Sequence, residues 1–229
     1  MCSRYELSVN AAELKAMLAR LLGAPPALPP GLADTAAVVP TAVVRPTDRA
    51  PVVLVDNQGA IVVARVPWGW PAPWDGSPLF NARIERLDEA PSFRPHLGRR
   101  CLVPATAWLE GRGQGRLRLG RADGGLVLMA GLYGRDAAGR PAFTVITRAA
   151  APAIAHIHPR MPALANEDEA ADSHAHPFAG LWLDPSTDAA EALARLAALP
   201  PPALIARAAT DAAPTTPDLF GAAPDGRES

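Results

Sequence analysis

Proline recurs throughout this chain, 26 times in 229 residues. Proline has a fixed φ and no backbone N–H, so it ends helices and is excluded from the middle of a sheet. We therefore expect short regular elements that are joined by many turns and irregular connections. Hydrophobic residues make up 49% of the chain, which is enough for a globular domain with its own core.

Hydrophobic spacing predicts helices at residues 11–22 and 189–199, each followed by glycine or proline, and a short helix at residues 149–157. The segments Asp56–Gly59 and Ala122–Gly125 separate apolar runs and predict two hairpins. The predicted strands are residues 38–44 (an edge strand or a loop, because Pro40 interrupts it), 52–55, 60–66, 101–103, 117–119, 126–130 and 143–147.

These elements predict a single α+β domain with a mainly antiparallel sheet. The sequence contains no internal repeat and no convincing linker. We expect the domain to span residues 1–209. Residues 210–229 are rich in Ala, Pro, Thr and Asp, and we expect them to form a flexible tail.

The charged residues limit the classes of partner. The net charge of −1 argues against a protein coated for non-specific nucleic-acid binding, although it leaves room for one basic groove. Lys15 is the only lysine, so a lysine Schiff base has almost no candidates, and the arginines suit bidentate phosphate contacts. Two cysteines make no disulfide framework, and the sequence shows no signal peptide and no long apolar span. We therefore expect a cytoplasmic protein with no membrane partner.

The chain begins Met1-Cys2-Ser3-Arg4. Initiator methionine is normally removed before a small residue, and its removal would leave Cys2 with a free α-amine and a thiol on adjacent carbons. An α-amine and a thiol ordinarily have pKa values near ~7.7–8.0 and ~8.5, so both have a reactive fraction at neutral pH. Such a pair can act as a nucleophile with its own base, or can condense with an aldehyde to a thiazolidine. The alternative is that Cys2 is an ordinary second residue.

Three polar side chains stand among apolar residues. Asn81 is either a turn former or an amide that orients an amine or an oxyanion. Arg83 shares its face if the segment is extended, and is either solvated or a phosphate ligand. Glu110 follows two large apolar residues; burial would raise its pKa and make it a proton shuttle, and a surface salt bridge is the alternative.

The segment His156–Pro162 contains two histidines and an arginine. His156 and His158 could form a metal pair, but their spacing differs from the usual zinc patterns. A single histidine that acts as a general acid near an anion-binding arginine is favoured instead. The other candidate ligands of a metal site are Cys101, His174 and His176.

Three tryptophans, at positions 68, 70 and 74, lie in a proline-rich segment. Such residues commonly pack in a core or a turn. An exposed tryptophan beside arginines would instead be a platform on which bases of single-stranded nucleic acid stack.

Together these features resemble the SOS response-associated peptidase (SRAP) family of abasic-site processing proteins. The resemblance covers Met1 to about Trp182 and depends on five short motifs that occur in the same order. The motifs are Met1-Cys2-x-Arg4-Tyr5, Trp68-Gly69 leading to Trp74, Asn81-Ala82-Arg83-x-Glu85, Arg99-Arg100-Cys101-Leu102-Val103-Pro104-Ala105 leading to Glu110, and Ile157-His158-x-Arg160-Met161-Pro162. Departures from the family pattern are Ser3, Leu109, Gly111 and Pro159, and none of them removes a residue assigned to chemistry.

The resemblance implies a barrel-like core with flanking helices, acting as a monomer and without a cofactor on abasic sites in single-stranded DNA, at the nucleoid when bound. Cys2 would form a thiazolidine crosslink with the ring-opened sugar aldehyde. Asn81 would hold the Cys2 amine, Glu110 would move protons, and His158 would assist ring opening. The same cluster would remove the initiator segment by peptidase-like hydrolysis, and an imine that stays open would permit lyase cleavage of the strand.

The resemblance also implies a set of DNA contacts. Arginines would hold phosphates, and a proline and a tryptophan would stack on or wedge against bases. The residues in these roles are Arg4, Pro40, Trp68, Arg83 and Arg160.

Two other classes of function remain open at this point. An N-terminal cysteine is also the nucleophile of some amide hydrolases, in which the α-amine is the base. A non-catalytic single-strand binding module would use the arginines and tryptophans and would not need Cys2. Dependence on Cys2 and on an aldehyde separates these alternatives from the crosslinking function.

Overall fold

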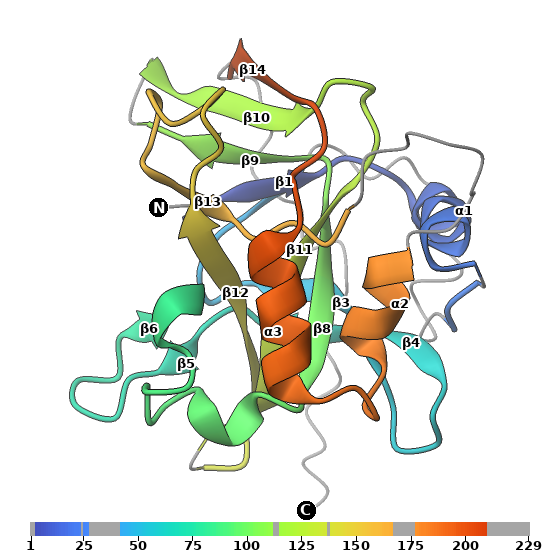
Figure 1. Ribbon diagram of the computed structural model, residues 1–229, viewed down its shortest axis with the longest axis vertical. Coiled ribbons are helices and arrows are strands. Elements are labelled where there is room, and N and C mark those ends of the chain that lie inside the picture. Colours follow the sequence, from blue (N-terminus) through green and yellow to red (C-terminus); the bar gives the residue numbers. More distant parts are fainter. Residues whose placement is uncertain are drawn as a thin grey trace, which may run out of the picture.

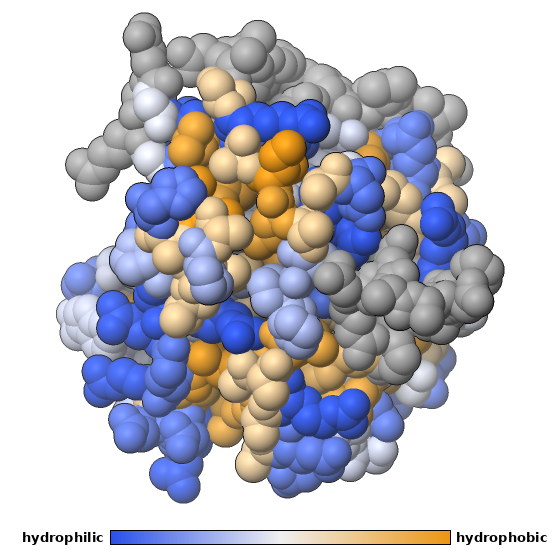
Figure 2. Space-filling view, turned by 45° about the horizontal axis from the view of Figure 1, so that its top comes forward, coloured by the Kyte–Doolittle hydropathy of each residue, from blue (hydrophilic) through white to orange (hydrophobic). Residues whose placement is uncertain are grey.

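The computed structural model describes residues 3–23, 25–27, 42–111, 115–136, 138–166 and 177–209. In this part of the chain, two large sheets and three α-helices pack in three layers, with the larger sheet in the middle, and a two-stranded sheet lies beside them (Figure 1). The prediction of a single α+β domain with mainly antiparallel sheets is confirmed. In Figure 2 hydrophobic side chains reach the surface between hydrophilic ones, which gather along both lower flanks of that view.

The central sheet has the strand order β13-β12-β11-β8-β3-β4, and β7 runs parallel to β12 beside it. Its strands are β3 (Arg49–Val55), β4 (Ile61–Pro67), β7 (Asn81–Arg83), β8 (Arg100–Ala105), β11 (Val127–Arg135), β12 (Pro141–Ala149) and β13 (Arg160–Pro162). Among the described strands β4 and β13 do not pair with each other, so the sheet stays open. The barrel-like part of the expected fold is therefore two packed open sheets.

The second sheet, called the five-stranded sheet below, has the order β14-β10-β9-β1-β2. Its strands are β1 (Tyr5–Leu7), β2 (Ala42–Val44), β9 (Ala107–Glu110), β10 (Leu117–Arg121) and β14 (Leu204–Ala208). The first strand of the chain lies between β2 and β9, so the N-terminal segment is part of the folded body.

The remaining elements are short. The helices are α1 (Ala11–Leu22), α2 (Pro177–Leu183) and α3 (Ala189–Ala198), the 3₁₀ turns are η1 (Ile84–Arg86) and η2 (Arg94–His96), and β5 (Trp70–Pro71) pairs with β6 (Pro78–Leu79). None of the described helices has both the length and the apolar composition that crossing a bilayer would require.

Alternation along β8 shows how the central sheet separates two hydrophobic cores. Cys101 and Val103 face the five-stranded sheet, whereas Leu102 faces the helices, and all three are fully buried. The core between the sheets contains Tyr5 and Trp108, so the aromatic side chains of the N-terminal region lie deep in the molecule. Strands that are buried on both faces explain the continuous apolar runs in the sequence.

Two local predictions are confirmed and have clear causes. Helix α1 begins with a capping box, in which Asn10 accepts from the Glu13 N–H and Glu13 accepts from the Asn10 N–H, and it ends at Gly23 with φ 73°. Strands β3 and β4 form the predicted hairpin, and Asp56 accepts from backbone N–H groups within its turn.

Other local predictions are wrong. Residues 117–130 do not form a hairpin, because β10 pairs with β9 and β14 while β11 pairs with β8 and β12 in the other sheet. The turn at 122–125 instead carries the chain from one sheet to the next. Residues 149–157 form successive turns and no helix. The short elements α2 and β14 were not predicted at all.

Arg100 joins the central sheet to the helical layer. Its side chain is 3% exposed and its guanidinium donates to the carbonyls of Trp182 (2.7 Å), Asp184 (2.5 Å) and Thr187 (3.0 Å). The last carbonyls of a helix have no partner within the helix, so Arg100 satisfies the C-terminal end of α2 and the turn that follows it.

Replacing Arg100 by alanine is expected to lower the free energy of unfolding by about 3–5 kcal/mol, because three carbonyls lose a charged donor in a buried region. Urea denaturation measures the change. Arg99 is the exposed neighbour, and Arg99→Ala should change the same quantity by less than about 0.5 kcal/mol. Equal losses in the two variants would contradict the bracing role of Arg100.

Candidate active site

Glu110 is the last residue of β9 and lies on the strand face that packs against the central sheet, like Trp108 two residues earlier. Its side chain is buried, with 5% of the residue exposed, so a surface salt bridge does not describe it. Burial raises the pKa of the Glu110 carboxyl, and the positive charge of nearby His158 partly opposes this rise. A carboxyl in this state can exchange protons closer to neutral pH than an exposed one.

His158 lies in the turn segment before β13, close enough to Glu110 to affect its pKa. Its Nδ1 atom is 3.0 Å from the backbone nitrogen of Arg160. The same atom is 3.0 Å from the carbonyl oxygen of Arg160, so it can accept from the N–H or donate to the carbonyl, depending on the tautomer. The backbone of Arg160 thus fixes the orientation of the ring.

Asn81 begins β7 and is held by the residue before it. The carbonyl of Phe80 accepts from Trp68 Nε1 at 2.8 Å and from the backbone N–H of Val145 at 3.0 Å. Asn81 itself lies opposite Val145 in the parallel pairing of β7 with β12. Its Oδ1 atom is buried, so the amide points into the molecule.

Antiparallel pairing brings the start of the described chain to Glu110. Tyr5 is the register partner of Trp108, and the Leu109 N–H donates to the Arg4 carbonyl at 2.9 Å. The same register sets Ser3 opposite Glu110. The predicted nucleophile Cys2 and the predicted base contact Pro40 lie outside the described residues.

The two other predicted phosphate ligands, Arg83 and Arg160, differ in whether their guanidinium groups already bind protein groups. Arg83 is exposed on β7. Arg160 donates to both carboxylate oxygens of Glu85, at 3.1 and 2.9 Å, and to the carbonyl of Thr147 at 2.6 Å. Burial raises the pKa of Glu85, but the hydrogen bonds from Arg160 outweigh it and the pKa is lowered. A phosphate at Arg160 must therefore share the guanidinium with Glu85.

Glu85 is a site residue to which the sequence assigned no role. It occurs in the Asn81-Ala82-Arg83-x-Glu85 motif, and its place in that motif was the available signal. The structure shows that Glu85 orients Arg160 across 75 positions of sequence.

The expectation that Trp68 stacks on bases disagrees with the structure. Trp68 has no exposed surface, and its ring packs against those of Tyr5, Phe80 and Phe143, with centroids 5.2, 5.6 and 6.3 Å away. An indole enclosed in this way cannot meet a base, and its position instead supports the segment before Asn81. The tryptophan that is exposed is Trp74, at 69%.

The candidate ligands of the alternative metal site can be placed only in part. No group of three or more His, Cys, Asp or Glu side chains that could hold a metal occurs among the residues the structure describes. Cys101 is fully buried, and burial raises the pKa of its thiol, so it is a poor thiolate ligand or nucleophile. His156 is exposed, and His174 and His176 lie outside the described residues.

Comparison with curated proteins finds relatives that are named abasic site processing proteins. The abasic site processing protein YoqW of Bacillus subtilis (strain 168) is 29% identical over 138 residues, which are 54% of this chain and 58% of YoqW. The abasic site processing protein YedK of Escherichia coli (strain K12) is 31% identical over 115 residues, 45% of this chain and 50% of YedK. The matched region therefore spans less than two thirds of either relative.

Solved structures match over more of the chain. A crystal structure of a Bacteroides thetaiotaomicron protein has a TM-score of 0.66 at 23% identity and covers 92% of this chain and 93% of that protein. A Bordetella bronchiseptica protein has a TM-score of 0.66 at 24% identity, with 91% of this chain and 100% of that protein covered. At these identities the similarity shows the shared fold.

The sequence also matches a protein family over most of its length. Residues 1–211 match the family described as SOS response associated peptidase (SRAP). This range contains both sheets, the three helices and every residue of the candidate active site. The chain therefore belongs to the SRAP family.

Proposed function

We propose that this protein recognises abasic sites in single-stranded DNA and links to them covalently through Cys2. The observation that carries the proposal is the buried Glu110 carboxyl beside His158. The β1–β9 register sets this carboxyl opposite Ser3, two residues before β1 begins. One peptide bond joins Ser3 to Cys2, which sets their Cα atoms about 3.8 Å apart. The names of YoqW and YedK, both abasic site processing proteins, agree with this substrate.

The chemistry needs two bond-forming steps. The Cys2 amine adds to the sugar aldehyde, and the resulting carbinolamine loses water to give an imine. The thiolate then adds to the imine carbon and closes the thiazolidine, so the net by-product is one water. Glu110 in its acid form protonates the departing hydroxyl, and its carboxylate then accepts the thiol proton.

Two further residues prepare the reactants. His158, in its imidazolium form, protonates the ring oxygen of the closed sugar while the anomeric hydroxyl loses its proton to water, which opens the ring to the aldehyde. Asn81 orients the Cys2 amine with its side-chain amide. Arg83, Arg4 and Arg160 bind phosphates on either side of the abasic position.

The same cluster suits two secondary activities. An imine that does not close to the thiazolidine can undergo elimination, which cleaves the strand as a lyase does. Hydrolysis of the bond before Cys2, with Glu110 as base, would be the self-processing activity that the family description names as peptidase. A hydrolase of other amides is a weaker candidate, because exposed Arg83 favours a phosphate-bearing substrate.

The direct test incubates the purified protein with a labelled single strand that carries one abasic site. We expect a shifted band that survives heat and denaturant, and none with a tetrahydrofuran analogue that has no aldehyde. A band of equal intensity with the analogue would show that the linkage does not use the aldehyde.

Crosslinking is expected to be much more efficient with a single strand than with a fully paired duplex. Glu110 is only 5% exposed, so we expect that the sugar must leave the base stack to reach its carboxyl, and a paired strand must first unstack. Crosslink yield on matched single-stranded and duplex substrates measures the difference. Equal yields would contradict this expectation.

A further inference from the structure

Four arginines form a row across the outer face of the five-stranded sheet, the face turned away from the central sheet. The register of the strands aligns them across the sheet. Continuing the β1–β2 register by one residue sets Arg45 opposite Arg4, whose carbonyl accepts from the Leu109 N–H. Leu109 is opposite Arg118 in β10, and Arg118 is opposite Arg207 in β14. Neighbouring strands are about 4.8 Å apart, so the row spans roughly 19 Å. We call Arg4, Arg45, Arg118 and Arg207 the arginine row.

The outer position of the row follows from strand alternation. Tyr5, Trp108 and Leu119 belong to the core between the sheets, so their neighbours in sequence point the other way. Arg45 and Arg207 are exposed and form no ion pair with another described residue, while Arg118 is about one third exposed.

The row places like charges side by side. Arg118 stands directly opposite Arg207, an arrangement of like charges that is destabilising in a sheet. Burial lowers the pKa of Arg4, and the charges of Arg116 and Arg45 lower it further. Glu6 accepts from Arg118 Nε at 2.6 Å, and this pair uses one of the five N–H donors of the guanidinium. Such crowding in a chain of net charge −1 is relieved when an anion binds.

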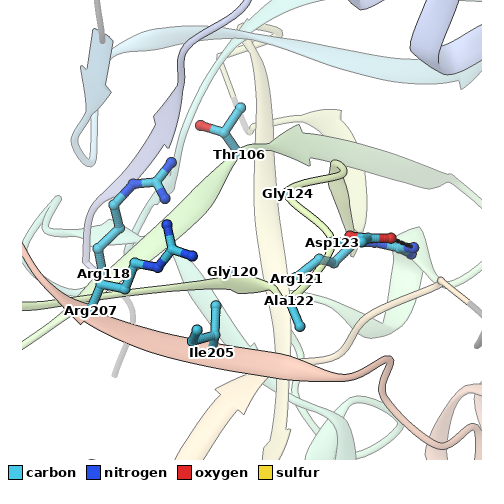
Figure 3. Close-up of a pocket in the computed structure, with 9 residues that line it drawn as sticks. All are labelled: Thr106, Arg118, Gly120, Arg121, Ala122, Asp123, Gly124, Ile205 and Arg207. Carbon is cyan, nitrogen blue, oxygen red and sulfur yellow. Dashed lines mark hydrogen bonds and ion pairs between the residues drawn. The ribbon is translucent and has the colours of Figure 1, made fainter.

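One end of the row contains a hollow that fits an anion. Its volume is about 210 Å³, and Arg118 and Arg207 extend side by side into it below Thr106 (Figure 3). Gly120 forms its floor, where a Cβ atom would come within 2.9 Å of the Thr106 carbonyl. Arg121 pairs with Asp123 at the far side of the hollow and does not share its charge with the row (Figure 3).

The row is next to the candidate active site. Arg4 follows Ser3 in β1's extension, and Leu109 precedes Glu110 in β9, so the row lies one residue away from the Ser3–Glu110 pair. Because side chains alternate along a strand, the row is on the opposite face of the sheet from Glu110. A DNA strand whose abasic sugar reaches Glu110 therefore contacts the arginine row where it crosses the edge of the sheet formed by the start of β1 and the end of β9.

We infer that the arginine row binds the phosphates of the DNA strand flanking the abasic site, with one phosphate in the hollow between Arg118 and Arg207. This inference rests on the proposed function for its choice of DNA as the occupant. It adds a second binding surface on the outer face of the five-stranded sheet, opposite the face that carries Glu110.

The first test measures binding of an intact single strand of about 20 nucleotides, without an abasic site, as a function of salt. Each lost phosphate contact lowers the slope of log K against log salt by about 0.7. Arg207→Gln should lower the slope by about 0.7, and Arg118→Gln/Arg207→Gln by about 1.4, with about a tenfold loss of affinity at low salt for the double variant. Arg20→Gln/Arg195→Gln removes the same charge from α1 and α3 in the opposite layer, and should leave the slope unchanged.

The second test separates the row from the chemistry. On an abasic strand of about four nucleotides, too short to reach the hollow, the double variant should crosslink like the native protein. The inference would be overturned if the salt slope of Arg207→Gln equalled that of the native protein. It would also be overturned if the double variant lost the same fraction of crosslinking on long and on short abasic strands. Because the first test uses intact DNA, it can succeed even where crosslinking fails, and the two failures are distinguishable. Arg207→Gln keeps the Glu6–Arg118 pair and removes a repulsion, so unfolding does not confuse the result.

Discussion

Cys2→Ala is expected to form no heat-stable crosslink with abasic DNA. The variant keeps a free α-amine after Met1 is removed, because alanine is also small, but it has no thiol to close the ring. The imine still forms, so sodium borohydride should trap the protein on the strand in amounts close to those of the native protein. Without ring closure the imine persists, and nicking of the abasic strand should increase.

A matched control removes the other thiol. Cys101 is fully buried between the sheets, so Cys101→Ala should crosslink normally once folded, with a stability loss of about 1–2 kcal/mol. Intact-mass measurement must first show that each variant begins at residue 2. If Cys2→Ala gives a heat-stable band of native intensity, the N-terminal aminothiol is not the reactive group.

Glu110→Gln is expected to slow crosslinking by roughly 10²–10⁴-fold, the range for loss of a general acid–base group. Glutamine keeps the size of the side chain and loses the titrating proton, so affinity for the DNA should change little. Single-turnover rates at saturating DNA measure the chemical step. His158→Ala should also slow the reaction, whereas His156→Ala, two residues away and exposed, should not. Native rates in Glu110→Gln would refute its role in proton transfer.

The pH dependence provides an independent check on Glu110. Its pKa is raised, mainly by burial, so the acid form persists above the pH at which an exposed glutamate ionises. The reaction needs this acid form together with an uncharged amine, so the native rate should fall at alkaline pH. In Glu110→Gln the rate should instead rise to a plateau as the amine loses its proton.

The raised pKa of Glu110 also makes the free energy of unfolding depend on pH. Between the ordinary and the raised pKa, the folded state binds more protons than the unfolded state, so the carboxylate reduces stability as pH rises through that window. Glu110→Gln has no such titration. The free energy of unfolding of Glu110→Gln should therefore not fall with pH through this window. Measuring it also shows whether a slow variant is folded.

Much of the fold could be predicted where the cause is local. The capping box and Gly23 bound α1, and the Asp56 turn sets the β3–β4 hairpin. The hairpin predicted around Ala122–Gly125 failed because strand partners are chosen by the whole core, and β10 finds β9 and β14 in another sheet. Helix α2 was missed because a distant residue, Arg100, stabilises its end.

The candidate site shows the same division. Motif order proposed Glu110 and His158 as candidates, and the structure places them close enough for His158 to affect the pKa of Glu110. It could not reveal that Trp68 is enclosed by three aromatic rings, because burial depends on residues up to 75 positions away, such as Phe143. The arginine row was equally invisible, since its members come from four strands and align only through the register of the sheet.

The position of β1 in the five-stranded sheet has a consequence for the order of events during synthesis. β1 emerges first from the ribosome, but its neighbour β9 follows about 100 residues later. At roughly 5–20 residues per second, this partner arrives on the order of 5–20 s afterwards. Until then β1 has only its β2 neighbour and the sheet around the terminus is incomplete, so we expect methionine aminopeptidase to have access to Met1. Translation thus gives the terminus time to be trimmed before the strand that carries Glu110 exists.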